Sequence, residues 1–330
     1  MFSGIVKAGK RCFAGIFVSQ GLTNYDKKEW NYAESQFRRA LRIAPDHYQA
    51  RYLLAEALCQ CDRFQEAEDE LTQAIKLRPK TDTAWRLRGL ARIELKKEEE
   101  AIADCQKSVE LKGDFSNYLS LGMAYTAAKK FVEAGEALGK AAKMDPKNAA
   151  VNESLGECML EQGRLEEARD AFRAAVKADS RDGAAYAKLA EVTEKLGDFK
   201  EALVHYTRAG FLEPKNAKYR VDAARVAIAD GDFSGAIISY QEAVKLDPEN
   251  ITALIALCQY AREINDLEKA HSYAERLIGA HPDEWQANLE MAITLSVEGK
   301  KSEAQGFLAK ALKLDNDAVK GELAKKGINF

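Results

Sequence analysis

The spacing of the prolines constrains the fold of this chain more than any other feature. Its 330 residues contain six prolines, and the gaps between them are 34, 67, 68, 34 and 34 residues. Proline lacks a backbone N–H and ends helices, so helix breaks in one register indicate an array of equal repeats. Length alone suggests two globular domains, and the register argues against that division. The prolines are Pro45, Pro79, Pro146, Pro214, Pro248 and Pro282.

Alignment on the prolines divides residues 14–318 into nine repeats, whose positions we number from the first residue of each repeat. Position 20 is alanine in every repeat, and position 8 is always glycine, alanine or cysteine. The third repeat is one residue short and has Gly113 at the proline position, so we expect the array to deviate there. The predicted repeats are 14–47, 48–81, 82–114, 115–148, 149–182, 183–216, 217–250, 251–284 and 285–318.

Apolar spacing predicts two helices in each repeat. Positions 4, 7, 8 and 11 form one face of the first helix, helix A, as Leu121 and Tyr125 illustrate. Positions 17, 20, 24 and 27 form the equivalent face of helix B, as in Phe233 and Tyr240. Short turns make consecutive helices antiparallel. Position 15, in the turn, is in five repeats a residue type that favours a left-handed helix end: Gly163, Gly197, Gly231, Asn265 and Gly299.

This pattern resembles the tetratricopeptide repeat family through Gly122-x-x-Tyr125, Phe131-x-x-Ala134, Ala141 and Pro146. The resemblance covers residues 14–318 and implies an all-α, right-handed α-solenoid of about nine helix-turn-helix repeats. Solenoids need a cap over their last apolar face. We therefore expect residues 319–330 to supply a C-terminal cap and tail, with one more helix over 317–326.

In proteins similar to this family, helix A positions 2, 5, 9, 12 and 13 line a concave groove that holds a peptide or partner helix. We expect a groove with an acidic centre and flanking apolar and basic strips, which binds another protein's segment carrying Lys or Arg beside apolar anchors. The alternative is that these positions are ordinary solvated helix faces. The predicted groove residues are Tyr52, Leu119, Met123, Glu153, Glu157, Glu161, Glu191, Glu194, Arg225 and Arg262.

One specialisation of the family can be compared directly with this sequence. Arrays that clamp the C-terminal carboxylate of chaperones carry a basic residue, two asparagines, a lysine and an arginine at set positions of three consecutive A helices. The corresponding residues of the first three repeats are Val18, Leu22, Leu53, Thr83 and Leu87. The clamp pattern is therefore absent from those repeats.

Residues 1–13 form a predicted amphipathic helical extension. Phe2, Ile5, Val6 and Phe13 share one helical face, with Arg11 on the opposite side. This helix either prolongs the first helix A and caps the array, or anchors residues 1–17 to a membrane surface or partner groove.

Composition argues against several other functions. Lys and Arg total 49 against 52 Asp and Glu, without the basic surplus typical of nucleic-acid-binding proteins. No apolar run is long enough to span a bilayer, the start does not fit a secretion signal, and six dispersed cysteines suit a reducing compartment. These features predict a cytoplasmic protein, which the N-terminal helix would make peripheral at a membrane.

The sequence also lacks the residue patterns of catalytic and metal sites. Its four histidines show no metal-ligand spacing, and the short, similar turns leave little room for catalytic loops. We therefore expect no enzyme activity, no cofactor and no metal. The favoured function is a protein–protein interaction scaffold or adaptor, with a membrane-recruited assembly factor as the alternative. An open array also allows self-association.

Overall fold

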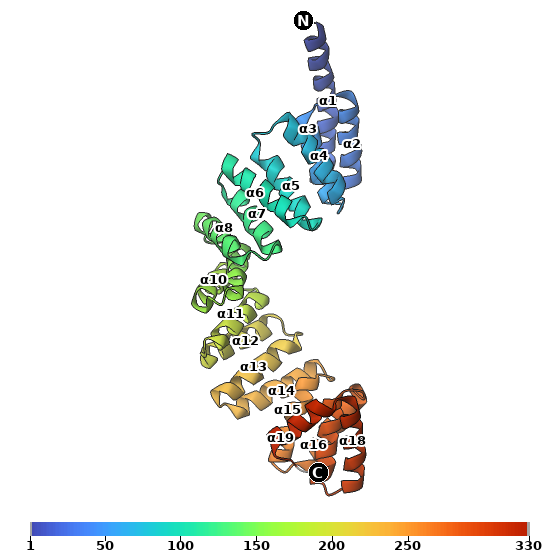
Figure 1. Ribbon diagram of the computed structural model, residues 1–330, viewed down its shortest axis with the longest axis vertical. Coiled ribbons are helices and arrows are strands. Elements are labelled where there is room, and N and C mark those ends of the chain that lie inside the picture. Colours follow the sequence, from blue (N-terminus) through green and yellow to red (C-terminus); the bar gives the residue numbers. More distant parts are fainter. Residues whose placement is uncertain (1, 329–330) are drawn as a thin grey trace. The chain divides into compact units, whose positions relative to one another are not determined.

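The computed structural model describes the backbone of residues 2–328 and the side chains of residues 9–328. Over that range every regular element is an α-helix, and successive helices of each unit pack side by side (Figure 1). The chain divides into two compact units between Ala178 and Asp179. Gly113 and Ser180 both stand where other repeats have proline. Gly113 lies inside the first unit, and the boundary between the units comes just before Ser180. The predicted all-α repeat fold is confirmed.

The helices of the two units follow one another in pairs, and one further helix ends the second unit. The first unit contains α1 Phe2–Asp26, α2 Trp30–Ile43, α3 Tyr48–Cys59, α4 Phe64–Leu77, α5 Asp82–Glu94, α6 Glu98–Leu111, α7 Phe115–Ala127, α8 Phe131–Met144, α9 Ala149–Glu161 and α10 Leu165–Ala178. The second unit contains α11 Gly183–Lys195, α12 Phe199–Leu212, α13 Ala217–Asp230, α14 Phe233–Leu246, α15 Ile251–Glu263, α16 Leu267–Ala280, α17 Trp285–Val297, α18 Lys301–Leu314 and α19 Asn316–Lys326.

Small residues let the paired helices approach closely. The alanine at position 20 is at most 1% exposed in every repeat. A Cβ atom at Gly122 on α7 would lie 2.5 Å from Cγ of Leu138 on α8, well inside van der Waals contact. The small residue at position 8 is thus required by the large residue at position 24, because the interior is close-packed.

The turn inside every helix pair places position 15 in the left-handed conformation. Glycine or asparagine, as predicted, occupies that position in five repeats. In the other four the residue is lysine or aspartate, and φ lies between 57° and 59° at Lys28, Asp62, Lys96 and Lys129. The sequence did not indicate the three left-handed lysines, because a long side chain with a Cβ disfavours the conformation.

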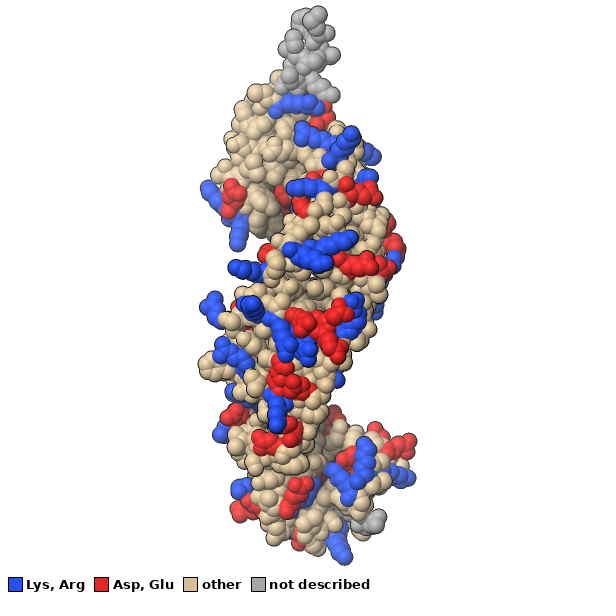
Figure 2. Space-filling view, turned by 90° about the vertical axis from the view of Figure 1, so that its left-hand side faces the viewer, with Lys and Arg blue, Asp and Glu red and all other residues tan. Residues whose placement is uncertain are grey.

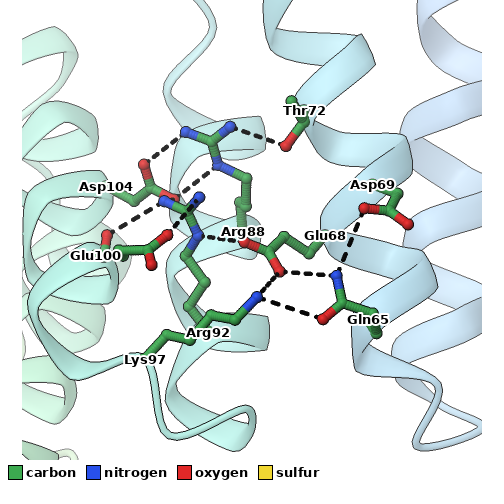
Figure 3. Close-up of polar contacts among 9 residues, drawn as sticks. All are labelled: Gln65, Glu68, Asp69, Thr72, Arg88, Arg92, Lys97, Glu100 and Asp104. Atoms are coloured by element: carbon green, nitrogen blue, oxygen red, sulfur yellow. Dashed lines mark hydrogen bonds and ion pairs between the residues drawn. The ribbon is translucent and has the colours of Figure 1, made fainter.

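A buried ion network joins α4, α5 and α6 (Figure 3). Arg88 and Arg92 occupy positions 7 and 11 of helix A, where the apolar spacing predicts core residues. The Nε and Nη2 atoms of Arg88 donate to the carboxylate of Asp104 at 2.8 and 2.7 Å, and the Asp104 side chain is only 3% exposed. The expectation of an apolar core face is therefore wrong in the third repeat.

Glu68 on α4 accepts hydrogen bonds from two further members of this network, Arg92 and Lys97. Arg92 donates to Glu68 at 2.8 Å and to Asp104 at 2.9 Å, and Nζ of Lys97 lies 2.6 Å from Glu68 (Figure 3). Burial opposes the charged form of Glu68, but the hydrogen bonds from Lys97 and Arg92 outweigh it and lower the pKa of this carboxyl. Charged groups thus replace apolar contacts where α4, α5 and α6 meet.

The last helix, α19, covers the end of the second unit as predicted. Val319 is fully buried against Leu289 and Ile293 of α17, which are 1% and 3% exposed. Nζ of Lys326 lies 2.8 Å from Oε1 of the buried Glu290. The capping helix is therefore confirmed, and it covers α17 positions 5 and 9, which would otherwise lie on the predicted groove face.

Candidate partner-binding surface

We define the inner strip as the side chains at helix A positions 2, 5, 9, 12 and 13. In the first unit it includes Tyr52 on α3, Leu119 and Met123 on α7, and three glutamates on α9. Helices α7 and α9 are neighbours, because Thr126 Oγ1 lies 3.5 Å from Cys158 Sγ. The three glutamates are Glu153, Glu157 and Glu161.

Tyr52 and Glu56 form a half-buried polar pair on α3. The Tyr52 hydroxyl donates to Oε1 of Glu56 at 2.7 Å, and the Tyr48 ring stacks on the Tyr52 ring at 6.3 Å between centroids. Burial, helped by the Glu56 carboxylate, raises the pKa of the Tyr52 hydroxyl. Burial also raises the pKa of Glu56, against the opposing effects of Tyr52 and Arg86. Tyr52 therefore presents its ring, rather than a free hydroxyl, at this surface.

The strip becomes apolar on α7 and acidic on α9. Leu119 is half-buried against Leu138 and Cys158, whereas Met123 is 45% exposed. On the neighbouring helix α9, Glu157 and Glu161 are exposed. An apolar side chain therefore lies on the helix next to the one that carries exposed carboxylates.

In the second unit the predicted acidic and basic residues pair with cations and carboxylates of the same unit. Glu191 lies 2.8 Å from Lys195, and Glu194 forms an ion pair with Arg225 of α13. The hydrogen bond to Glu194, opposed by desolvation, raises the pKa of Arg225. A partner's cation would have to compete with these contacts, so this part of the strip is less acidic than its sequence suggests.

Arg262 on α15 does not lie on an open surface. Its side chain is 11% exposed, and Nη2 lies 2.5 Å from Oε2 of Glu290. The same carboxylate also forms an ion pair with Lys326. Burial opposes ionisation of Glu290, but Arg262 and Lys326 outweigh burial and lower the pKa of the carboxyl. Arg262 thus belongs to the buried contacts that join α15, α17 and α19, and we leave it out of the surface proposed below.

An open hollow of about 950 Å³ lies at one end of the strip in the second unit. The turns before α13 and α15 form its wall, together with Lys218, Val221 and Thr252 at strip positions. Figure 2 shows Lys and Arg interspersed with Asp and Glu on the face that it draws. The five predicted glutamates divide between the units, with three in the first and two in the second.

The N-terminal extension is continuous with the first helix A, because α1 runs from Phe2 to Asp26. Phe13 and Ile16 are 55% and 52% exposed, and Nη2 of Arg11 lies 2.7 Å from Asp46. The predicted anchor residues Phe2, Ile5 and Val6 lie outside the described side chains. Among the described residues, no helix combines the length and apolarity needed to cross a bilayer.

Two features of the described residues bear on metal binding and on thiol reactivity. That part of the chain holds no group of three His, Cys, Asp or Glu side chains placed to bind a metal ion. Burial raises the pKa of the Cys59 thiol to about 11 and that of Cys105 to about 12, so neither forms a reactive thiolate near neutral pH.

Family models identify the repeats independently. A model described as tetratricopeptide repeat matches residues 25–107, 125–192 and 227–287, and a second model of that description matches residues 187–251. An Hsp70-Hsp90 organizing protein of Triticum aestivum is 31% identical over 96 residues, which are 29% of this chain and 16% of that protein. The match therefore spans only a small part of that relative.

Three solved structures share the fold. The C-terminal part of a TPR repeat-containing protein from Cytophaga hutchinsonii has a TM-score of 0.65 at 15% identity, covering 72% of this chain and 97% of that one. A tetratricopeptide repeat protein from Parabacteroides merdae has a TM-score of 0.52 at 17% identity, covering 74% and 97%. YrrB, a TPR protein with an unusual peptide-binding site, has a TM-score of 0.51 at 19% identity, covering 58% and 97%.

Proposed function

Because the chain belongs to the tetratricopeptide repeat family, we propose that it is a non-catalytic scaffold that holds a segment of a partner protein on its inner strip. Proteins of this family mediate protein–protein interactions, and the fold generally serves as an interaction scaffold rather than as an enzyme. Such a scaffold needs a surface that its own helix packing leaves uncovered. The proposed place of action is the cytoplasm, as the sequence predicts.

The observation that carries this proposal is the α7–α9 surface of the first unit. Met123 is 45% exposed beside the half-buried Leu119, and Glu157 and Glu161 are exposed on the neighbouring helix. Apolar anchors supply affinity, and carboxylates select the charge of the partner. The surface therefore suits a partner segment that carries Lys or Arg beside apolar side chains.

The descriptions of two similar proteins support an interaction role, and one of them names a peptide-binding site. YrrB is described by its peptide-binding site, and the Triticum aestivum relative by its organisation of Hsp70 and Hsp90. In this chain the clamp positions of the first three repeats carry apolar residues and a threonine, such as Val18 and Leu53. We therefore propose an internal segment of the partner as the ligand, and not a chaperone C-terminal carboxylate held by such a clamp.

Fluorescence anisotropy tests the proposal with a labelled synthetic peptide that alternates leucine anchors with arginine. Met123→Asp and Glu157→Lys should each weaken its binding about tenfold, because one removes an anchor and the other reverses a selecting charge. The matched control, Lys143→Glu on the exposed side of α8, should bind like the wild type. Equal affinity for the wild type and both strip variants would reject the proposal.

A second candidate function rests on α1. Phe13 and Ile16 are more than half exposed on a helix that also exposes Lys10 and Arg11. An amphipathic helix of this composition lies in the interface of an anionic membrane. The full chain should therefore sediment with vesicles containing phosphatidylserine, and Phe13→Asp with Ile16→Asp should abolish sedimentation. Equal sedimentation of the two proteins would remove the membrane function and leave the scaffold untouched.

A further inference from the structure

The helices α12 and α14 expose large apolar side chains that the inner strip does not use. Val204 and Phe211 on α12 are 64% and 70% exposed, and Ile238 on α14 is 58% exposed. Val204 and Phe211 are seven residues apart and therefore lie on one face of their helix. All three belong to the second unit, at helix B positions.

These side chains depart from the pattern of the other repeats. Val204 and Ile238 occupy position 22, which is Ser, Asp, Glu, Ala or Gly in the remaining seven repeats. Phe211 occupies position 29, which is Lys or Arg in six repeats, Glu in one and Gly in one. The repeat fold therefore does not require apolar residues at these positions, and their exposure calls for another explanation.

Contacts through α13 hold the two helices next to each other. Arg220 on α13 donates to the carbonyl oxygen of Gly210 on α12 at 3.5 Å and lies 3.3 Å from the carboxylate of Glu242 on α14. Leu203 of α12 packs into the same core cluster as Ala236 of α14. The exposed apolar side chains are thus carried by two helices that pack against the same helix, α13.

The cations around these side chains lack carboxylate partners among the described residues, whereas Glu201, three residues before Val204 on α12, contacts His205. Lys200, Arg208 and Lys245 are exposed on the same two helices, and no carboxylate within the described chain lies at ion-pair distance from any of them. The Arg208 guanidinium lies over the Phe211 ring at 5.4 Å from its centroid, a cation–π contact that keeps both groups together. The nearby carboxylate of Glu242 already contacts Arg220.

We propose that this surface, the α12–α14 patch, binds an acidic amphipathic segment of a partner protein. The patch consists of Val204, Phe211 and Ile238 with Lys200, Arg208 and Lys245. A partner helix with an apolar stripe would cover the three apolar side chains, and its flanking Asp and Glu would meet the three unpaired cations. This ligand has the opposite charge to the one proposed for the inner strip, so the patch is a second interaction surface that stands independently of the first.

Fluorescence anisotropy tests the patch with a labelled helical peptide that carries a leucine stripe flanked by glutamates. The variant Val204→Ser, Phe211→Ser, Ile238→Ser should weaken binding at least about tenfold, since it removes every apolar anchor. Serine already occupies position 22 in two other repeats, so the variant should keep its fold, which circular dichroism verifies. Arg208→Glu with Lys245→Glu should weaken binding as much and reduce its dependence on salt.

Two controls separate the patch from general stickiness. Val132→Ser, at a side chain 57% exposed on α8, should bind the acidic peptide like the wild type. A peptide with lysine in place of glutamate should bind the wild-type patch at least about tenfold more weakly. Unchanged affinity in both patch variants, or equal binding of the lysine peptide, would overturn the proposal.

Two other occupants are tested with the same proteins. Dimerisation of the wild type that the triple serine variant abolishes would show that a second copy of the chain covers the patch. Patch-dependent sedimentation with phosphatidylserine vesicles, without binding of the acidic peptide, would assign the patch to a membrane. Either result would overturn the proposal. If the Met123 and Glu157 variants bind the arginine peptide as tightly as the wild type, the inner-strip proposal fails and the patch proposal still stands.

Discussion

The two units build the same helix pair with different turn residues. In three of the four turns of the second unit, a left-handed glycine or asparagine is followed by an aspartate whose side chain accepts a hydrogen bond from the backbone N–H three residues later, at Asp198, Asp232 and Asp266. In the fourth, Gly299 is followed by Lys300, which makes no such cap. In four of the five turns of the first unit, strained residues are followed by Glu29, Arg63, Lys97 and Lys130, none of which caps its helix through a side chain. The fifth turn has Gly163 at the left-handed position. Side-chain capping of this kind therefore supports three turns of the second unit and none of these four turns of the first.

Three turns of the first unit are supported by ion pairs with the preceding repeat instead. Arg63 lies 2.7 Å from Glu34, Lys97 lies 2.6 Å from Glu68, and Lys130 lies 2.7 Å from Glu99. Each of these ion pairs joins a turn to the helix B before it. A repeat can therefore stabilise its turn with a side-chain cap of its own or with an ion pair to the preceding repeat. The ion pair also couples adjacent repeats.

The largest expected effect comes from breaking the ion network of the first unit. Asp104→Asn leaves the buried guanidinium of Arg88 without its carboxylate, which should lower the free energy of unfolding by about 3 to 5 kcal/mol. Urea unfolding followed by circular dichroism measures the change. On the same helix, Glu110→Gln removes an exposed pair with Lys107 and should leave stability nearly unchanged. Equal effects would mean that the buried network does not hold α4, α5 and α6 together.

The second unit has its own buried carboxylate, Glu290. The pH dependence of stability tests whether its ion pairs stabilise the fold. The folded-state pKa of Glu290 is lowered, so its contribution to stability is present above the unfolded pKa and is lost as pH falls through the folded value. Glu290→Gln should lower the free energy of unfolding by about 3 kcal/mol at pH 7. The difference between variant and wild type should shrink as pH falls below about 4.3, the ordinary pKa of glutamate. A difference that stays constant with pH would contradict the pairing of Glu290 with Arg262 and Lys326.

The third effect concerns the local turn support of the second unit. Asp232→Ala removes the side chain that accepts from the Gly235 N–H at 2.9 Å, and should cost about 1 kcal/mol. The equivalent change in the first unit, Lys130→Ala, removes only an exposed contact with Glu99 and should cost less. Thermal melts of the two variants measure the comparison. Equal costs would show that the turns are supported alike, and a larger cost for Lys130→Ala would contradict the comparison.

The smallest expected effect is a gain in stability. Lys129 holds φ at 57°, and Lys129→Gly should raise the free energy of unfolding by up to about 1 kcal/mol by relieving that strain. Gly231→Ala, at φ 86° in the second unit, should be destabilising by a similar amount. Urea unfolding of both variants provides the measurement. A loss of stability in Lys129→Gly would show that the lysine side chain contributes more than its backbone strain costs.

The repeat register was readable because each packing requirement recurs. Alanine at position 20 and a small residue at position 8 follow from close contact between paired helices, so the same residue types return at one spacing. Arg88 and Arg92 could not be placed from that pattern, since their partners Asp104 and Glu68 are distant in sequence and only the packed repeats bring them together. A charged residue at a core position was the one available signal.

For the surface residues too, the sequence predicted some positions and not others. Helical spacing assigned Met123 and Glu157 to one face of helix A, and both are exposed. The spacing assigned Arg262 to that face too, but Glu290 of the next helix A receives its guanidinium. Exposure depends on neighbouring repeats, which a single helical wheel does not include.

By itself, the sequence determined the helix content, the repeat length and the family of this protein, because these follow from short-range spacing that every repeat restates. Only the tertiary structure decided which charges are buried in pairs, where the array divides into two units, and which faces stay open. The physical reason is that burial and ion pairing depend on side chains from different helices meeting in space. The prolines mark the ends of six of the nine repeats, and the contacts between repeats decide which surfaces stay open.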